Sequence, residues 1–258
     1  PWAPDTYEGA PTPITAFLAV ASKTAGFIAL LQLVFVAFPE RDDVYQPLFW
    51  VLALLTMTVG NLIALRQPNV VRLFAYSGVA QAGYMIAGLA VAGDVGDSAL
   101  QAISTYLVIY AAMNLGVFAI IIAVARKTRS GDIASYGGLF EYAPGLAVSM
   151  VVFLFSLAGI PPLAGWYAKF AIFKVTVEAD SWIGYSLAVA IAINSVIALF
   201  YYANIARQMF MNPVPDGDTT RIRVPFSLVA ALVLTVVATV GLGVFPRAVT
   251  QITEVSLL

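Results

Sequence analysis

Long apolar runs, separated by short turns, account for most of the chain. Seven runs are long enough for a membrane-spanning helix, which needs about 20 residues. We place these helices near residues 12–38, 47–65, 70–92, 99–125, 145–177, 181–210 and 225–246. Turn-forming pairs such as Pro68-Asn69 and Ser130-Gly131 separate neighbouring runs. The pattern predicts an all-α membrane protein, in which residues 1–258 form a single domain that is a bundle of seven transmembrane helices.

The fifth run is interrupted where a membrane helix would normally be continuous. Pro161 and Pro162 each remove a backbone N–H and clash with the preceding helical turn. Gly159 and Gly165 flank the prolines and tolerate irregular backbone. Carbonyl groups freed within a bilayer need partners inside the protein or beside a water-filled cavity. We therefore expect a discontinuous helix, broken near Gly159–Pro162, of the kind found at transport sites.

Two lysines lie deep within the predicted helices. Lys23 is roughly 16 Å along the first helix from Thr12, near the middle of a hydrocarbon core about 30 Å thick. Lys169 follows the proline break. Charges at this depth are costly and typical of ion or proton pathways, although a static ion pair is the alternative for Lys23. Lys174 is nearer the end of its helix, and we interpret it as extending toward the headgroups.

Several predicted helices also contain uncharged side chains that form hydrogen bonds, namely Asn61, Gln81, Tyr84, Asn114 and Asn194. Hydrogen bonds between helices are one interpretation of these residues. The other, for Gln81, Tyr84 and Asn114, is that they organise water along a proton path. The adjacent Tyr201 and Tyr202 are typical of an interfacial aromatic belt.

Composition supports the membrane interpretation and excludes several kinds of chemistry. Hydrophobic residues make up 61% of the chain and charged residues 10%, against roughly 45–50% and 25% in soluble domains. The net charge of −1 does not indicate nucleic-acid binding. The sequence contains no Cys and no His, which excludes thiol catalysis, an iron–sulfur cluster and histidine ligation. We predict no catalytic redox site, no cofactor-binding residue and no metal ligand in this chain.

The charges between the runs alternate along the chain. Arginine and lysine gather near residues 66–72, 126–144 and 207–223, and acidic residues dominate the other three loops. The positive-inside rule places the three basic loops in the cytoplasm. Pro1 is then cytoplasmic, and Leu258 lies on the opposite face.

The opening stretch contains four prolines between Pro1 and Pro13. They argue against a regular helix there, so we expect a loop. The chain also begins without Met and without a signal peptide. We expect a fragment whose N-terminal part is missing.

Three stretches carry a family resemblance: Trp2 to Pro13 leading into Ala21-Ser-Lys23, Arg72 to Tyr84, and Ser156 to Phe170. In this order they resemble the antiporter-like membrane subunits of proton-pumping NADH:quinone oxidoreductase (respiratory complex I), most closely subunit N and its organellar counterparts. The resemblance implies the second half of a fourteen-helix subunit. The break near Gly159 would be that of helix twelve.

The resemblance also implies roles for individual residues. Lys23 matches the central-axis lysine of the family and Lys169 its terminal lysine, so both are candidates for proton transfer. A glutamate and a lysine that work with them in the family would precede Pro1. The family often has His where Gln81 stands, which keeps a polar side chain but removes a titratable one.

The function implied is proton translocation through a buried lysine and water relay, coupled to quinone reduction in other subunits. NADH, FMN, iron–sulfur clusters and quinone would be held by those partners. The expected location is a bacterial plasma membrane, with an organelle inner membrane or thylakoid as alternatives. Two other functions stay open: a subunit of a multisubunit sodium/proton antiporter, and a structural membrane subunit that transports nothing.

Overall fold

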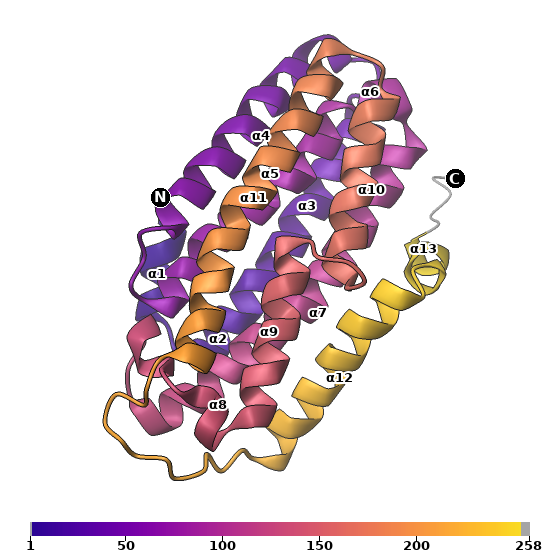
Figure 1. Ribbon diagram of the computed structural model, residues 1–258. Coiled ribbons are helices and arrows are strands. Elements are labelled where there is room, and N and C mark those ends of the chain that lie inside the picture. The colour runs from indigo at the N-terminus through magenta and orange to yellow at the C-terminus, as the bar shows by residue number, and fades with distance from the viewer. Residues whose placement is uncertain (1, 254–258) are drawn as a thin grey trace.

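A computed structural model of the protein describes residues 2–253, which form a bundle of helices (Figure 1). Within these residues, six helical segments are long and apolar enough to cross a membrane. They are Thr12–Ala37, Asp42–Ala64, Val70–Ala90, Asp97–Thr128, Trp182–Met211 and Phe226–Val244. The predicted all-α class is confirmed. Pro1 and Leu258, used above to assign sidedness, lie outside the described residues.

The first long segment contains two π-helical stretches. It consists of α2 (Thr12–Phe17), the π-helix η1 (Leu18–Ser22), α3 (Lys23–Gln32) and the π-helix η2 (Leu33–Ala37). Short π-helical stretches inside α-helices are rare and are frequently found at functional sites. The first of them ends immediately before Lys23.

The middle of the chain forms α4 (Asp42–Ala64), α5 (Val70–Ala90), α6 (Ala92–Val95), α7 (Asp97–Thr128), the 3-10 helix η3 (Ile133–Tyr136) and α8 (Leu139–Tyr142). Asn69 caps α5, because its side chain accepts hydrogen bonds from the backbone N–H groups of Val71 and Arg72 at 2.8 and 3.2 Å. Helix α4 begins at Asp42, ahead of the predicted start near residue 47. Two aspartates in its first turn favour this start through the helix dipole, and Pro47 lies within the helix.

The fifth apolar run forms two helices, α9 (Pro144–Ala158) and α10 (Ala164–Glu178), which are joined by a short loop (Figure 1). Helix α9 ends at Ala158, and the next residue, Gly159, has a φ of 92°, in the left-handed region that glycine adopts readily. The chain continues with α11 (Trp182–Met211), α12 (Phe226–Val244) and α13 (Arg247–Thr253).

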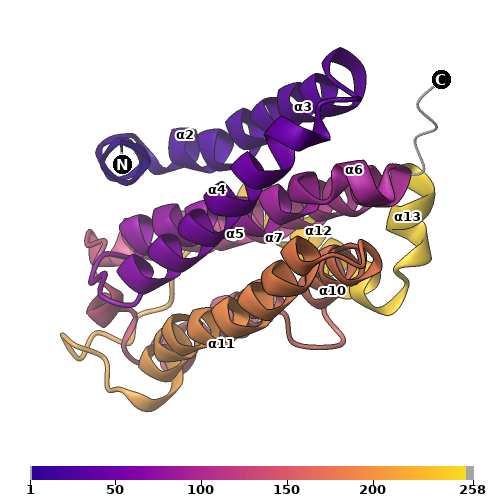
Figure 2. The same ribbon diagram turned by 90° about the horizontal axis from the view of Figure 1, so that it is seen from above.

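Figure 2 shows three layers of helices, with α2 and α3 on one side, α4, α5 and α7 in the middle, and α10 and α11 on the other side. Helices α4 and α5 have the most extensive contact among the described helices. A Cβ atom on Gly83 would lie 2.6 Å from the backbone nitrogen of Met57, and one on Gly60 would lie 2.9 Å from that of Ala80. Glycine at both positions therefore lets the two backbones approach closely, as is common between membrane helices.

The opening stretch is helical, so the loop prediction for it was wrong. Helix α1 (Ala3–Gly9) has Pro4 in its first turn, where the missing N–H has no helical partner to lose. Arg72 at the start of α5 pairs with Asp5 and with Glu8, at 2.8 Å in each case. These ion pairs hold α1 against α5.

Candidate functional site

Lys169 lies on α10 beside the interruption between α9 and α10, and only 6% of its surface is exposed. Its Nζ donates a hydrogen bond to the backbone carbonyl of Ala158 at 3.0 Å. The same atom lies 4.7 Å from the centre of the Tyr84 ring. A Cβ atom on Gly159 would lie 3.0 Å from Lys169 Cδ. The interruption thus supplies both an acceptor for the ammonium group and room for its side chain.

The two prolines explain which carbonyl groups are free. In a continuous helix the carbonyls of Leu157 and Ala158 would accept from the N–H groups of residues 161 and 162. Both of those residues are proline and have no N–H. Ala158 accepts from Lys169 instead, and Leu157 accepts from Nε2 of Gln81 at 3.2 Å. For each proline, one polar side chain therefore donates the hydrogen bond that the missing N–H would have supplied.

Gln81 on α5 is buried and hydrogen-bonded at both ends of its amide. Its Nε2 also donates to the hydroxyl of Tyr202 at 3.3 Å, and its Oε1 accepts from the hydroxyl of Tyr106. Ser77 shares a further hydrogen bond with Tyr202 at 2.6 Å. The side chain of Gln81 thus joins α5 to α7, α9 and α11, as expected for an interhelical hydrogen bond.

Lys23 is half-buried at the start of α3. Its Nζ donates to the carbonyl of Gly78 at 2.5 Å and to the hydroxyl of Tyr110 at 3.0 Å. It adjoins a cavity of about 220 Å³ that Tyr7 and Ser22 also line. Such a volume is large enough for several water molecules.

Neither Lys23 nor Lys169 has a carboxylate within 4.0 Å among residues 2–253. Their partners are carbonyl groups, a hydroxyl group and aromatic rings. The static ion pair considered for Lys23 is therefore absent from this part of the protein. Lys174 by contrast is exposed and pairs with Glu178 at 3.2 Å.

A polar stripe on α7 contacts both the Gln81 cluster and Lys23. Tyr106, Tyr110 and Asn114 follow one another at intervals of four residues, so they share a helix face. Tyr106 contacts Gln81, and Tyr110 contacts Lys23. Nδ2 of Asn114 is buried and has no hydrogen-bond partner among the described residues. A buried amide of this kind is a common site for an ordered water molecule.

A second polar cluster fixes the tyrosine beside Lys169. Nδ2 of Asn61 on α4 donates to Oδ1 of Asn194 on α11 at 3.1 Å and to the hydroxyl of Tyr84 at 3.3 Å. Oδ1 of Asn61 accepts from the hydroxyl of Tyr201 at 3.0 Å. The cluster ties α4, α5 and α11 together and holds the Tyr84 ring in place against Lys169.

The prediction that Tyr201 and Tyr202 form an interfacial belt was wrong. Both are buried, with exposures of 3% and 0%, and their rings pack edge to face at 4.4 Å. Their hydroxyl groups reach the amides of Asn61 and Gln81, so burial leaves neither hydroxyl unpaired. The position of the two tyrosines in the sequence suggested the belt. Their hydrogen-bond partners on α4 and α5 could be identified only from the three-dimensional structure.

The sequence prediction also missed Tyr106 and Tyr110. Their spacing from Asn114 in a run that is otherwise apolar was the available signal. The backbone carbonyl groups of Gly78 and Ala158 could not be identified individually, although the proline pair indicated that free carbonyls would be present.

A helical bundle with an interrupted helix and a buried lysine beside the interruption is an arrangement found at ion and proton sites of membrane proteins. Residues 1–197 match the family described as NADH:quinone oxidoreductase/Mrp antiporter, transmembrane, and the chain belongs to this family.

Relatives and solved structures agree with this assignment. The chain is 40% identical over 257 residues to NADH-quinone oxidoreductase subunit N 2 of Solibacter usitatus, with 99% of this chain and 51% of the relative covered. It is 43% identical to subunit N of Geobacillus kaustophilus, with 95% and 50% covered. The chain thus spans about half the length of the curated relatives it matches.

Among solved structures, a chain of respiratory complex I from Thermus thermophilus with bound aureothin is 31% identical, with a TM-score of 0.80 over 97% of this chain and 53% of that one. A chain of the Mrp complex from Dietzia sp. is 21% identical, with a TM-score of 0.87 over 98% and 54%. The second likeness shows a shared fold alone.

Proposed function

We propose that this chain is part of a proton-translocating membrane-arm subunit of NADH:quinone oxidoreductase. The observation that carries the proposal is the pair Lys23 and Lys169, two lysines within apolar helices that are each held only by uncharged groups among residues 2–253. An ammonium group without a fixed counter-charge changes its protonation more readily than one in an ion pair. Relatives of about 40% identity that are named subunit N support the assignment to this enzyme.

In the proposed architecture, α9 and α10 together form one discontinuous transmembrane helix. This helix and the six long segments make seven spans, which belong to one membrane domain and form the second half of a fourteen-helix subunit. The length of the relatives supports this division, since each is about twice as long as the matched region. The loops near 66–72, 126–144 and 207–223 would face the cytoplasm.

In the proposed relay, Lys169 exchanges protons with one side of the membrane and Lys23 with the hydrated central axis. The Ala158 carbonyl and the Tyr84 ring stabilise the protonated form of Lys169. The Tyr110 hydroxyl donates to Lys23 when the lysine is neutral and accepts from it when charged. Water near Asn114 and in the cavity beside Lys23 would complete the path, with Gln81 and Tyr84 as positioning residues.

The proposal assigns the redox chemistry to partner subunits. NADH, FMN, iron–sulfur clusters and quinone would be bound there, and quinone reduction would drive the relay. The described residues contain no group of three or more His, Cys, Asp or Glu side chains arranged to hold a metal ion. The expected location is a bacterial plasma membrane.

The proposal is tested by measuring proton pumping by the assembled complex that contains the full-length subunit. Lys23→Ala and Lys169→Ala are each expected to reduce the number of protons pumped per NADH oxidised. Lys174→Ala is the matched control, because this exposed lysine lies on the same helix as Lys169. Normal pumping in both Lys23→Ala and Lys169→Ala would favour a structural subunit. Cation exchange without redox partners would favour an antiporter subunit.

A further inference from the structure

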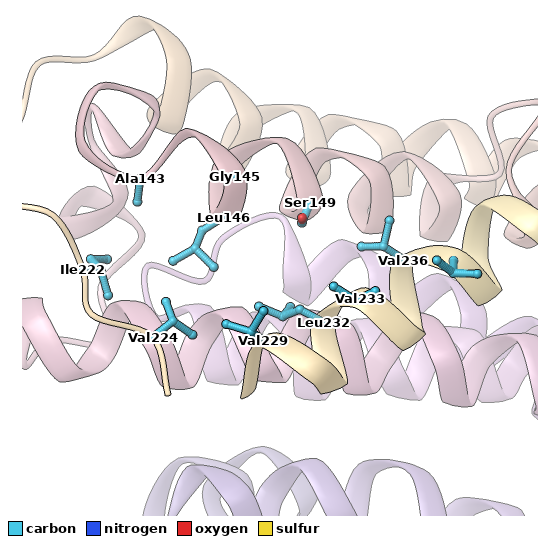
Figure 3. A pocket seen from close by; sticks show the side chains of 11 residues that line it. Ala143, Gly145, Leu146, Ser149, Ile222, Val224, Val229, Leu232, Val233 and Val236 are labelled. Atoms are coloured by element: carbon cyan, nitrogen blue, oxygen red, sulfur yellow. The ribbon is translucent and has the colours of Figure 1, made fainter. Parts of the chain in front are cut away.

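A groove between α9 and α12 has no part in the proposed proton path. Its volume is about 420 Å³. Figure 3 shows Leu146 and Ser149 of α9 facing Leu232 and Val233 of α12 across this space. Ile222 and Val224, from the segment that leads into α12, lie at one end (Figure 3).

The groove belongs to a surface suited to lipid. Within α12 only Leu232 and Thr239 are buried, whereas Val233 and Val237 are 56% and 63% exposed. The lining is apolar apart from Ser149. From Val229 to Val237 it extends about 12 Å along α12, which is comparable with the roughly 15 Å that one leaflet contributes to the hydrocarbon core.

The segment at one end of the groove carries positive charge. Arg221 and Arg223 alternate with Ile222 and Val224 along the chain, and both arginines are exposed. They lie just before Phe226, the first residue of α12. If the acyl chain of a lipid lies along α12, its headgroup is expected near these two arginines.

The charged segment is held in place from α7. Nζ of Lys127 donates to the carbonyl groups of Asp218 and Thr220 at 2.6 and 2.8 Å. The carboxylate of Asp218 lies 3.5 Å from the same nitrogen. That acidic group is therefore engaged by Lys127. Of the other nearby carboxylates, Glu141 is exposed on α8, two residues before Ala143 of the groove.

We propose that this groove binds an acyl chain of an anionic phospholipid whose phosphate lies against Arg221 and Arg223. Apolar side chains would contact the acyl chain, and the guanidinium groups would form charge-assisted hydrogen bonds with the phosphate. Loss of one arginine is expected to reduce the preference for anionic over zwitterionic lipid about fivefold. The site requires insertion into a membrane and is independent of proton transport.

The test compares lipids retained by the assembled complex after extraction from nanodiscs that contain phosphatidylcholine and phosphatidylglycerol. Ser149→Phe places a ring in the groove and is expected to lose one retained lipid per subunit, as counted by native mass spectrometry. Val148→Phe is the matched control, because Val148 is 50% exposed and does not line the groove. Equal retention by these two variants would overturn the proposal.

A second pair of variants tests the headgroup separately. Arg223→Gln is expected to lower the ratio of retained phosphatidylglycerol to phosphatidylcholine about fivefold. Arg247→Gln, at the other end of α12, should leave the ratio unchanged. An unchanged ratio in Arg223→Gln would overturn the headgroup assignment. Cross-linking of a Ser149→Cys variant to another polypeptide segment would show that protein fills the groove, which would overturn lipid binding.

Discussion

The ammonium group of Lys169 occupies the place of the backbone N–H that Pro162 lacks. The carbonyl of Ala158 would accept from residue 162 in an unbroken helix, and it accepts from Lys169 Nζ at 3.0 Å instead. The Lys169 side chain is thus stabilised by the Ala158 carbonyl, which is free to accept this hydrogen bond only because the helix is interrupted. The position of the proline pair in the sequence therefore determines which carbonyl is free to bind the lysine.

The first prediction concerns this replacement. Pro162→Ala restores an N–H that competes with Lys169 for the Ala158 carbonyl, and a hydrogen bond to a charged group contributes about 1.5–3 kcal/mol. We expect proton pumping per NADH to fall while the complex still assembles. Pro161→Ala is a comparison variant rather than a neutral control, because it restores a partner for Leu157 and so affects Gln81 before Lys169. Full pumping in Pro162→Ala would contradict the importance of the freed carbonyl.

The second prediction separates the ring of Tyr84 from its hydroxyl group. The ring faces Lys169 at 4.7 Å, and the hydroxyl accepts from Asn61 at 3.3 Å. Tyr84→Phe keeps the ring, whereas Tyr84→Leu removes a cation–π contact of about 0.5–2 kcal/mol. Pumping should fall further in the leucine variant than in the phenylalanine variant. Equal pumping rates in the two variants would show that the ring does not stabilise the ammonium group.

The third prediction concerns Lys23. Tyr110→Phe removes the hydroxyl 3.0 Å from Nζ but keeps the ring, whose centre lies 4.3 Å away. We expect slower pumping with normal assembly, because the lysine loses the only partner among residues 2–253 that can both donate to it and accept from it. Tyr136→Phe is a suitable control, since Tyr136 is equally buried but lies in η3. If Tyr110→Phe pumps at the same rate as Tyr136→Phe, Tyr110 takes no part in the proton relay.

The fourth prediction is about stability. Asn194→Leu removes the 3.1 Å hydrogen bond from Asn61 and leaves Asn61 Nδ2 with two longer bonds of 3.3 Å, to the Tyr84 hydroxyl and to the backbone carbonyl of residue 194. Loss of one such hydrogen bond costs about 0.5–1.5 kcal/mol. The variant complex should unfold at a lower temperature. Adding Asn61→Leu should cost less than the sum of the two single changes, because the double variant leaves fewer unpaired groups. Strict additivity in a thermal unfolding series would show that the two amides do not interact.

The fifth prediction uses pH outside the membrane. The N–H and hydroxyl of Thr220 first, and then Lys127, lower the pKa of the Asp218 carboxyl below its ordinary value. A lowered pKa means that the contact is complete above the ordinary range of an aspartate and is lost as pH falls through the folded value. Limited proteolysis of the segment 212–225 should therefore increase on acidification. Asp218→Asn should be cleaved at a rate that no longer depends on pH in this range.

Much of the bundle could be predicted because apolar length and turn residues are local properties. The runs from 70–92 and 181–210 correspond closely to α5 and α11. The helix at the opening stretch could not be predicted, because its contacts are with residues far away in sequence, such as the ion pairs of Asp5 and Glu8 with Arg72. The π-helical turn before Lys23 likewise leaves no pattern in an apolar run.

The candidate site was predictable only in part, for a similar reason. Lys23 and Lys169 are conspicuous as charges in apolar runs, and the proline pair indicated free carbonyl groups. Which carbonyl faces which side chain depends on how α5, α7, α9 and α10 pack, as the Gln81 and Lys169 contacts show. Tyr202 was misassigned because a tyrosine looks the same in sequence whether its hydroxyl reaches water or a buried amide.

The most direct test of the account is the protonation state of Lys169 during turnover. The full-length subunit would carry ¹⁵N-labelled lysine in its assembled complex. The ¹⁵N NMR signals of the lysine side chains would be compared at rest and during NADH oxidation, and Lys169→Arg would identify the Lys169 signal. The account predicts that the Lys169 signal changes between ammonium and amine on turnover. A Lys169 signal that remains that of an ammonium group throughout turnover would contradict it.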